Sequence, residues 1–464
     1  MDEQISSSPS FSFGDESFSP QSRDELVRAV ADALAEGRQE DVHALVVPLH
    51  YSDGARLFER LNAEQRRLLI DIMRFEFDAE ILCDLDPAVR EDVVACLGFA
   101  DLAAAVRELD SDDAVHLVGH LNDDERERVL AALPLEDRTM ITQGLSYPEY
   151  TAGRLMQREL VAVPAYWTVG QTIDYLRESP NLPEDFYDIY VVDPRHRPAG
   201  KVALNRLLRA RRPVRLREIL DLAVQSIAVT MDQEDVAVLF REHDLVSGPV
   251  VDRSGRLVGV ITVDDVVDVI DKEAADDMLR LGGVAEPDLY RAVIGTVRSR
   301  FTWLLVNLGT AVLVSMVIGM FDGTIKQIVT LAVLMPIVAS TGGNAGTQTM
   351  TVAVRALATR ELTAGNALRV LGKEILVGCL NGVIFSAIIG TVTWIRFGTL
   401  EISFIIAAAM VINIVCAALA GLLVPLGFDR IKVDPAVASP VFVTAVTDVI
   451  GFFAFLSLAT FLLL

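Results

Sequence analysis

The last third of the chain, residues 301–464, consists of long apolar segments that contain one polar stretch and one isolated acid. The polar stretch runs from Thr341 to Thr349, and the acid, Asp448, lies within the final apolar segment. A bilayer strongly penalises such groups unless they line water or an ion. This block is therefore interpreted as an ion pathway through a membrane.

Basic residues flank the apolar segments unevenly, which predicts how they cross the membrane. Five segments are each long enough to span ~30 Å of hydrocarbon as a helix. Only Lys326 and Arg396 lie on the side away from the N-terminus. Because basic loops are retained in the cytoplasm, residues 1–300 are predicted to be cytoplasmic and Leu464 to lie outside. The predicted segments are 301–321, 327–353, 367–394, 402–427 and 437–463.

The net charge of −23 belongs almost entirely to residues 1–300, since residues 301–464 are close to neutral. A strongly acidic soluble part argues against nucleic-acid binding, which needs basic surface, and indicates cations as partners. The N-terminus is acidic and rich in Ser and Phe, and is not expected to be a signal peptide. No C-x-x-C pair is present, so scattered thiols in a reducing cytosol are expected. The cysteines are Cys83, Cys96, Cys379 and Cys416.

The first part of the soluble region is predicted to be a stack of short helices. Residues 1–22 are Ser-rich and predicted to be disordered, and residues 23–140 to form a helical N-domain. Between 49 and 133 an apolar residue recurs every twelve positions, often followed by Asn or Asp, which favour helix N-caps. Such a repeat is typical of an α-solenoid, which needs no catalytic site. His116 and His120 have the spacing of a zinc pair, but no third ligand is near, so a metal role is not favoured.

Residues 150–271 alternate between strands and helices in two similar halves. The pattern resembles a tandem pair of CBS domains, regulatory modules that often bind adenine nucleotides. That family commonly holds ribose with a Ser/Thr-x-x-Asp motif, which the second half has at Thr262 and Asp265. The first half has Ala203 and Arg206 at these positions, so ATP binding by the pair is doubtful and the cofactor-binding residues are unknown.

Two acidic elements adjoin the membrane block. Residues 272–300 form a predicted helical connector, and Glu273, Asp276 and Asp277 gather near its start. Asp434 precedes a proline at the start of the last segment, which is an ordinary helix N-cap. The same acid also suits a cation ligand at the inner mouth of a pore, and the sequence leaves both interpretations open.

Asp448 and the polar stretch can serve either helix packing or an ion. A buried acid can be protonated or bonded across a helix interface, and glycines let two helices approach closely. In the alternative, a twofold dimer brings two copies of Asp448 together on its axis, where they suit a hydrated Mg²⁺ ion. Asn344 and backbone carbonyls freed by the glycines would then face the same pore.

The order of a helical N-domain, tandem CBS domains, an acidic connector and five membrane segments resembles the MgtE family of magnesium transporters and channels. The most specific motifs are Thr-Gly-Gly-Asn-Ala-Gly-Thr-Gln from Thr341, Val-Asp-Pro-Ala around Asp434 and Thr-Asp-Val around Asp448. The resemblance implies a multidomain membrane protein with a cytosolic α-solenoid, an α/β tandem CBS pair, a plug-like connecting helix and an all-α domain of five transmembrane helices. It also implies a homodimer in the lipid of the bacterial inner membrane, and no enzyme activity.

The resemblance further implies a route for the ion and a way to close it. Mg²⁺ is expected to bind Asp448 in a pore on the dimer axis. Cytosolic Mg²⁺ is expected to bridge the N-domain, the CBS domains and the connector, which closes the pore. His116 stands where a metal-binding acid of the family is expected, so sensing there is expected to be weaker or absent. The implied pore-lining residues are Gly342, Gly343, Asn344, Gly346, Thr347 and Asp448, and the implied metal ligands are Glu80, Asp112, Glu234, Asp244, Asp265, Asp268, Glu273, Asp276, Asp277, Asp434 and Asp448.

Other functions fit parts of the sequence. An intramembrane aspartyl protease would need Asp434 and Asp448 at one depth, but along a helix they lie ~20 Å apart, and the usual GxGD motif is missing. A non-transporting membrane sensor would not need the costly polar stretch. Transport of Co²⁺ or Mn²⁺ stays open, because the sequence does not set selectivity among divalent cations or separate a channel from a carrier.

Overall fold

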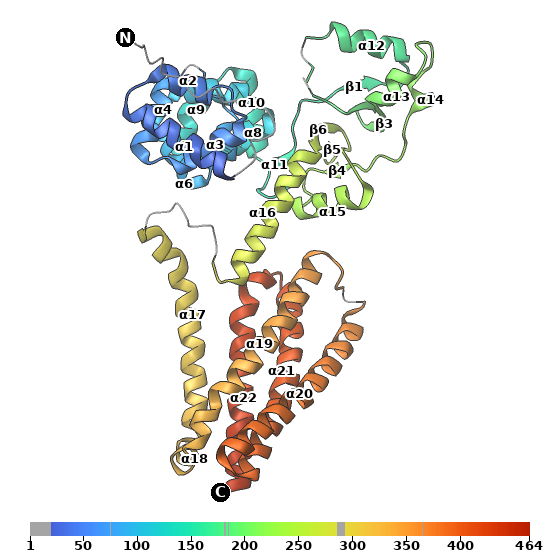
Figure 1. The fold of residues 1–464 in the computed structure, drawn as a ribbon. Helices are drawn as coiled ribbons and strands as arrows, with labels where there is room; N and C mark the ends of the chain where they lie inside the picture. Colours follow the sequence, from blue (N-terminus) through green and yellow to red (C-terminus); the bar gives the residue numbers. More distant parts are fainter. Residues whose placement is uncertain (1–19, 75, 181, 184, 285–292, 364) are drawn as a thin grey trace, which may run out of the picture. The chain divides into compact units, whose positions relative to one another are not determined.

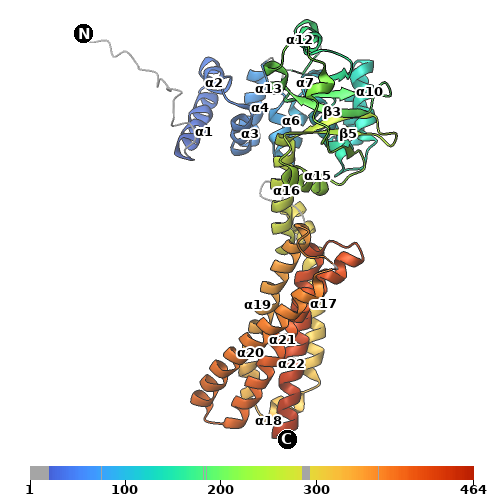
Figure 2. The same cartoon turned by 90° about the vertical axis from the view of Figure 1, so that its right-hand side faces the viewer.

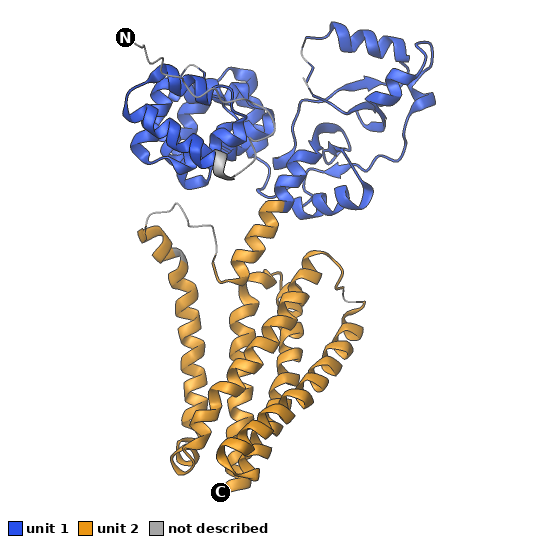
Figure 3. Cartoon of the chain, in the orientation of Figure 1, with its two compact units in different colours: residues 1–270 blue, residues 271–464 orange. Residues whose placement is uncertain are grey.

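A computed structural model describes residues 20–464 except 75, 181, 184, 285–292 and 364. The chain divides into two units, residues 1–270 and residues 271–464 (Figure 3). Of the tail predicted to be disordered, residues 1–19 lie outside the described residues. The first helix begins at Pro20, slightly earlier than the predicted start.

The N-terminal part of unit 1 is a stack of short helices, as the repeat predicts (Figures 1 and 2). The helices are α1 (Pro20–Ala35), α2 (Gln39–Val46), α3 (Tyr51–Arg60), α4 (Ala63–Met73), α5 (Ile81–Asp84), α6 (Pro87–Cys96), α7 (Phe99–Glu108), α8 (Ser111–His120), α9 (Asp123–Ala132) and α10 (Leu135–Leu145). From α6 to α9 each helix has 10 residues, and the next one begins after a two-residue connection.

Polar residues start these helices where the sequence places them. Asn62, Asp86 and Asn122 accept hydrogen bonds from the first-turn backbone of α4, α6 and α9. Such caps satisfy backbone N–H groups that have no partner within the helix, and each contributes about 1 kcal/mol. Asp110 also precedes a helix, but its side chain makes no cap bond to the backbone of α8.

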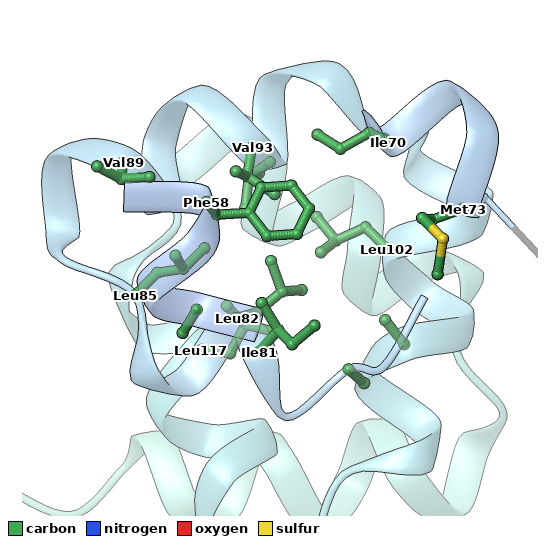
Figure 4. Packing of buried hydrophobic residues seen from close by; sticks show 14 of the residues in the cluster. Phe58, Ile70, Met73, Ile81, Leu82, Leu85, Val89, Val93, Leu102 and Leu117 are labelled. Atoms are coloured by element: carbon green, nitrogen blue, oxygen red, sulfur yellow. The ribbon is translucent and has the colours of Figure 1, made fainter. Parts of the chain in front are cut away.

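The apolar positions of the repeat form one core. Figure 4 shows Phe58 of α3, Leu82 of α5, Leu102 of α7 and Leu117 of α8 gathered within it, and all four are almost fully buried. Burial of one such side chain stabilises a fold by about 1.5–3 kcal/mol. The leucines at the ends of the repeats are buried as well: Leu61, Leu85, Leu109, Leu121 and Leu133.

The rest of unit 1 contains two three-stranded sheets of the same topology. In each sheet a parallel pair of strands is followed by an antiparallel hairpin, in the order β1-β2-β3 and β4-β5-β6. This confirms the two similar halves that the sequence predicts. The elements are α11 (Ala152–Leu155), β1 (Ala162–Pro164), α12 (Val169–Glu178), β2 (Asp188–Val192), β3 (Pro198–Ala203), α13 (Leu204–Arg209), α14 (Leu216–Ile219), β4 (Ile227–Ala228), α15 (Gln233–His243), β5 (Ser247–Val251), β6 (Leu257–Thr262) and α16 (Val263–Leu281).

A buried polar network joins the two sheets. The hydroxyl of Tyr190 on β2 lies 2.6 Å from that of Ser247 on β5, which donates to Asp188 at 2.8 Å. Lys201 on β3 donates to the same carboxylate at 2.7 Å. Buried polar groups that satisfy one another in this way specify one arrangement of the elements that carry them. The network therefore fixes the second half of the pair against the first.

Unit 2 contains the apolar helices. Among the residues that the structure describes, four helices are long and apolar enough to cross a membrane by length and composition: α17, α20, α21 and α22. Helix α19 has 29 residues and carries the polar stretch. Together they correspond to the five predicted segments. The helices are α17 (Val293–Gly319), α18 (Asp322–Gln327), α19 (Thr330–Ala358), α20 (Ala367–Phe397), α21 (Leu400–Arg430) and α22 (Pro435–Leu463).

The acidic connector differs from the prediction. Helix α16 begins at Val263, directly after β6, and ends at Leu281, so the acids of the connector continue a helix that starts in the CBS pair. Residues 285–292 of the predicted connector lie outside the described residues, and the residues from Val293 onward belong to α17.

Candidate cation sites

Helix α19 runs without a break through the polar stretch. The hydroxyls of Thr341 and Thr347 donate to carbonyls one turn earlier, that of Thr347 to Gly343 at 2.9 Å. The expectation of carbonyls freed by the glycines is therefore wrong. Since a helix keeps its carbonyls in its own hydrogen bonds, any ion contact made by this stretch would come from side chains.

The buried face of α19 carries two of the glycines. A methyl group on Gly342 would overlap the amide of Asn413 on α21, and one on Gly346 would lie 2.8 Å from Val443 on α22. Gly421 of α21 in turn has the carbonyl of Gly346 within 2.7 Å of its methyl position. Small residues let α19, α21 and α22 approach closely, which is how helices associate in lipid.

Asn413 is a residue that the sequence reasoning missed. Its side chain is fully buried, and its Nδ2 donates to the carbonyl of Val338 on α19 at 2.8 Å. It also fills the space left by Gly451 on α22, where a methyl group would lie 2.7 Å from Nδ2. Among the described residues its Oδ1 has no hydrogen-bond partner. An amide in the middle of the apolar segment 402–427 was the signal that could have drawn attention to it.

The remaining side chains of the stretch lie on other faces of α19. Asn344 and Thr347 are exposed in the single chain, and a methyl group on Gly343 would meet open space. Asp448 on α22 is partly exposed. The structure thus separates Gly342 and Gly346, which pack the helices, from polar groups that are free to face water or an ion.

Asp434 has both of its carboxylate oxygens in use. Oδ1 accepts a hydrogen bond from the backbone of Ala436 at 2.8 Å, so the residue is the N-cap of α22. Oδ2 accepts from the guanidinium of Arg280, in the last turn of α16, at 2.7 Å. The cap interpretation is confirmed. A positive charge also lies where a pore-mouth cation would bind.

Asp277 lies one turn before Arg280 on α16. Partial burial raises the pKa of Asp277, and the nearby charge of Asp434 raises it further, while Arg280 opposes both effects. Glu273 and Asp276 add smaller repulsions to the same carboxyl. The guanidinium of Arg280 thus binds Asp434 and offsets part of the repulsion that Asp277 receives from Asp434, with Glu273 and Asp276 further along α16.

The second acidic site lies in unit 1, between the helical stack and the CBS pair. Asp112 is in the first turn of α8, and Asp265 is in the first turn of α16. Oδ1 of Asp112 is closed to solvent and has no hydrogen-bond partner among the described residues. Burial raises the pKa of Asp112 well above its usual range, and the charge of Asp265 raises it further.

Asp265 is held by the motif that the sequence reasoning assigned to ribose. The hydroxyl of Thr262 donates to Oδ2 of Asp265 at 2.9 Å. Burial raises the pKa of Asp265 to about 7, against the opposing effect of this hydrogen bond, and the charges of Asp264 and Asp113 add to the shift. A buried carboxyl that holds its proton to this pH gains from any neighbouring cation.

Neighbouring residues extend the acidic site and anchor it. Burial raises the pKa of Asp113 to about 6, and the charges of Asp110 and Glu80 raise it further. Next to Asp112, the hydroxyl of Ser111 donates to Glu159 at 2.7 Å and accepts from the backbone of Arg158 at 2.7 Å. These bonds connect the start of α8 to the strand-bearing part of the unit, so Asp112 is not on a free surface.

The structure does not gather the other predicted ligands into one site. Within the described residues no group of three or more His, Cys, Asp or Glu side chains is placed to hold a metal ion. Glu234 lies in the first turn of α15, and Asp244 ends that helix in a left-handed conformation. Asp268 lies on α16, where its charge acts on Tyr51. His116 stacks on His120, with ring centroids 4.4 Å apart.

Three family profiles match the chain. One for MgtE, described as divalent cation transporter, matches residues 335–458. A profile for the MgtE intracellular N domain matches residues 49–150, and one for the CBS domain matches residues 216–272. The last of these covers the second half of the predicted pair.

Curated relatives match along nearly the whole chain. "Magnesium transporter MgtE" of Thermus thermophilus is 32% identical over 456 residues, which cover 95% of this chain and 99% of the relative. The protein of the same name from Bacillus subtilis is 25% identical and covers 94% of this chain and 97% of the relative. Among solved structures, the cytosolic domain of the Mg²⁺ channel MgtE in complex with ATP is 32% identical, covers 52% of this chain and 99% of that one, and has a TM-score of 0.49.

Proposed function

The chain belongs to the MgtE family of divalent cation transporters, which are not enzymes, and on this premise we propose that it carries Mg²⁺ through a pore that cytosolic Mg²⁺ closes. The observation that carries the gating part is the pair Asp112 and Asp265. One carboxylate oxygen of this pair is closed to solvent without a hydrogen-bond partner among the described residues, beside a second acid from another domain.

The pore part of the proposal rests on the polar side chains outside the helix seam. Asn344 and Thr347 are exposed and Asp448 is partly exposed, while Gly342 and Gly346 are occupied by packing. In a homodimer a twofold axis would bring two copies of Asp448 together. Mg²⁺ releases its water reluctantly, so it would pass largely hydrated between the two carboxylates.

The gating part follows from like charges. Without a bound cation, the carboxylates of Asp112 and Asp265 repel each other when both are ionised, which disfavours the arrangement that brings them together. Mg²⁺ between them removes this repulsion, and a ligand shifts a conformational equilibrium by its difference in affinity for the two states. Oxygen sites of few protein ligands bind with dissociation constants of roughly 10⁻⁴–10⁻³ M, which suits a sensor of abundant Mg²⁺.

At the inner mouth of the proposed pore, the guanidinium of Arg280 competes with a cation for Asp434. Arg280 neutralises one oxygen of Asp434 while Asp277 lies within range of both charges. A Mg²⁺ ion that enters from the cytosol has to displace the guanidinium of Arg280 before Asp434 and Asp277 can bind the ion together. Glu273 and Asp276 supply further oxygen ligands on the same helix, and Glu80, Glu234, Asp244 and Asp268 remain proposed ligands in unit 1.

Two alternatives are kept. All proposed ligands are oxygen donors, which suit Mg²⁺ and also Mn²⁺, so a carrier of other divalent cations such as Co²⁺ or Mn²⁺ is the nearest competitor. A non-transporting sensor is the other. ATP stays outside the proposal, since Thr262 and Asp265 are bonded to each other and Asp265 lies beside Asp112.

The test is patch recording of the reconstituted full-length protein with varied internal Mg²⁺. Changing Asp112 and Asp265 together to Asn should leave Mg²⁺ current but weaken its closure by internal Mg²⁺. Asp124→Asn is a matched control, because Asp124 occupies the corresponding first-turn position of α9 and is exposed. Closure of the double variant at the same internal Mg²⁺ as the parent would refute the gating role, and absence of any divalent current would refute transport.

Topology is part of the proposal. We place residues 1–300 in the cytoplasm and the C-terminus outside, from the distribution of basic residues. A reporter that works only outside the cytoplasm, fused after Leu464, should be active. Activity of a cytoplasmic reporter at the same point would reverse the orientation.

A further inference from the structure

A groove of about 200 Å³ opens between the first half of α19 and the last half of α20. Val333 and Ile337 of α19 and Val392 of α20 line it with exposed apolar surface, at 62%, 37% and 53% exposure. In a membrane protein such surface faces lipid chains or another apolar segment. The groove takes no part in the cation sites described above.

The polar residues that line the groove lie at one end of it. Arg396, whose side chain is exposed, lies at that end, and Thr393 lies one turn deeper. Thr393 is 1% exposed, and its hydroxyl has no hydrogen-bond partner among the described residues. Deeper again, Ile389 and Val392 are apolar. Along α20 a charged group is therefore followed by a hydroxyl and then by hydrocarbon. The rise along the helix axis is ~4.5 Å from Arg396 to Thr393 and ~10 Å from Arg396 to Ile389.

The end with Arg396 lies at the boundary of the membrane helices. Helix α20 ends at Phe397, Gly398 caps it in a left-handed conformation, and α21 begins at Leu400. The guanidinium of Arg396 lies 5.6 Å from the ring centre of Phe397 and pairs with no carboxylate of the described residues. Basic and aromatic side chains at such boundaries sit at the level of lipid headgroups.

We propose that this groove binds one glycerophospholipid. Its phosphate pairs with Arg396, and an ester carbonyl of its glycerol accepts a hydrogen bond from the hydroxyl of Thr393. One acyl chain lies between α19 and α20. A glycerophospholipid carries phosphate, ester and hydrocarbon in this order, and so satisfies in turn the charge, the buried hydroxyl and the apolar walls. An apolar helix of a second copy would cover the walls but offer no acceptor to the buried hydroxyl and no anion to the guanidinium. The proposal does not depend on gating by Mg²⁺.

The experiment is native mass spectrometry of the delipidated full-length protein in detergent, titrated with phosphatidylglycerol. The parent should retain one lipid per chain. Arg396→Ala should weaken binding about tenfold or more, since a charge-assisted hydrogen bond is lost. Arg396→Lys should weaken it less. Thr393→Val, which keeps the shape and removes the hydroxyl, should weaken it severalfold, and Val392→Trp should fill the groove and block binding.

Lys326→Ala is the control, because Lys326 is also basic, exposed and close to the same end of α19, but lies outside the groove. It should bind lipid like the parent, and all variants should remain monodisperse. Unchanged lipid binding by both Arg396→Ala and Val392→Trp would overturn the proposal. Displacement of the lipid by inorganic phosphate alone would show a simple anion site instead. Spontaneous disulfide formation between chains in Val392→Cys would show that a second copy covers the groove.

Discussion

The charge on Asp265 should lower the stability of unit 1 at neutral pH, by an amount that can be worked out. Its pKa is about 7 in the folded chain and about 4 in an unfolded one. Each pKa unit corresponds to about 1.4 kcal/mol, so ionising this buried carboxyl costs up to about 4 kcal/mol. Asp265→Asn removes that cost but keeps the shape of the side chain.

The sign of the pH dependence follows from the raised pKa. As pH rises from about 4 to about 7, the unfolded chain has already released this proton while the folded chain still holds it. The free energy of unfolding of the parent should therefore fall across this range and change little above it. In Asp265→Asn the part of the decrease in the free energy of unfolding that comes from this carboxyl should be absent. At pH 8 the variant should therefore be more stable than the parent.

The assay is chemical unfolding of residues 20–281, which end with α16, at pH 5 and pH 8. Mg²⁺ should stabilise the parent at pH 8, by about 2.7 kcal/mol at one hundred times its dissociation constant, and should stabilise Asp265→Asn much less. Asp124→Asn should behave like the parent.

Equal stability of the parent and Asp265→Asn at pH 8, with equal gains from Mg²⁺, would refute the reasoning. It would mean that the pair of Asp112 and Asp265 is well solvated in the folded unit. Equal gains from K⁺ at the same ionic strength would reduce the effect to screening of surface charge.

Three further predictions concern unit 2. Gly342→Ala should overpack the contact between α19 and α21, destabilise the fold by about 1–3 kcal/mol and lower the melting temperature in detergent. Adding Asn413→Ala should recover part of the lost stability, and no recovery would show that another contact limits the approach of these helices. Asp448→Asn should abolish Mg²⁺ uptake into proteoliposomes without loss of folded protein, and full uptake would remove Asp448 from the pore. Arg280→Ala should change stability by no more than about 1 kcal/mol, since the pair with Asp434 is partly exposed, yet it should shift closure to lower internal Mg²⁺; an unchanged Mg²⁺ response would exclude the guanidinium as a competitor.

Much of the architecture was determined by local sequence. Asn62 and Asn122 start helices because a cap and the backbone it satisfies lie within three residues of each other, so a sequence pattern contains both partners. From Leu61 onward, the apolar residue at every twelfth position lies at the end of a short helix. The strand pattern of residues 150–271 was readable for the same reason, because alternate strands and helices differ in period over a few residues.

Tertiary structure alone decided which polar groups meet. Arg280 and Asp434 are 154 positions apart, and no periodicity connects them. Asn413 occupies space left by Gly342 and Gly451, two glycines on different helices, so its role exists only once three helices pack. The sequence shows that glycines flank Asn344, but it does not show that Gly342 and Gly346 lie on the buried face of α19 while Asn344 lies on an exposed face. The division follows from the phase of α19 against its neighbours, which depends on side-chain packing across the whole seam and not on any local motif.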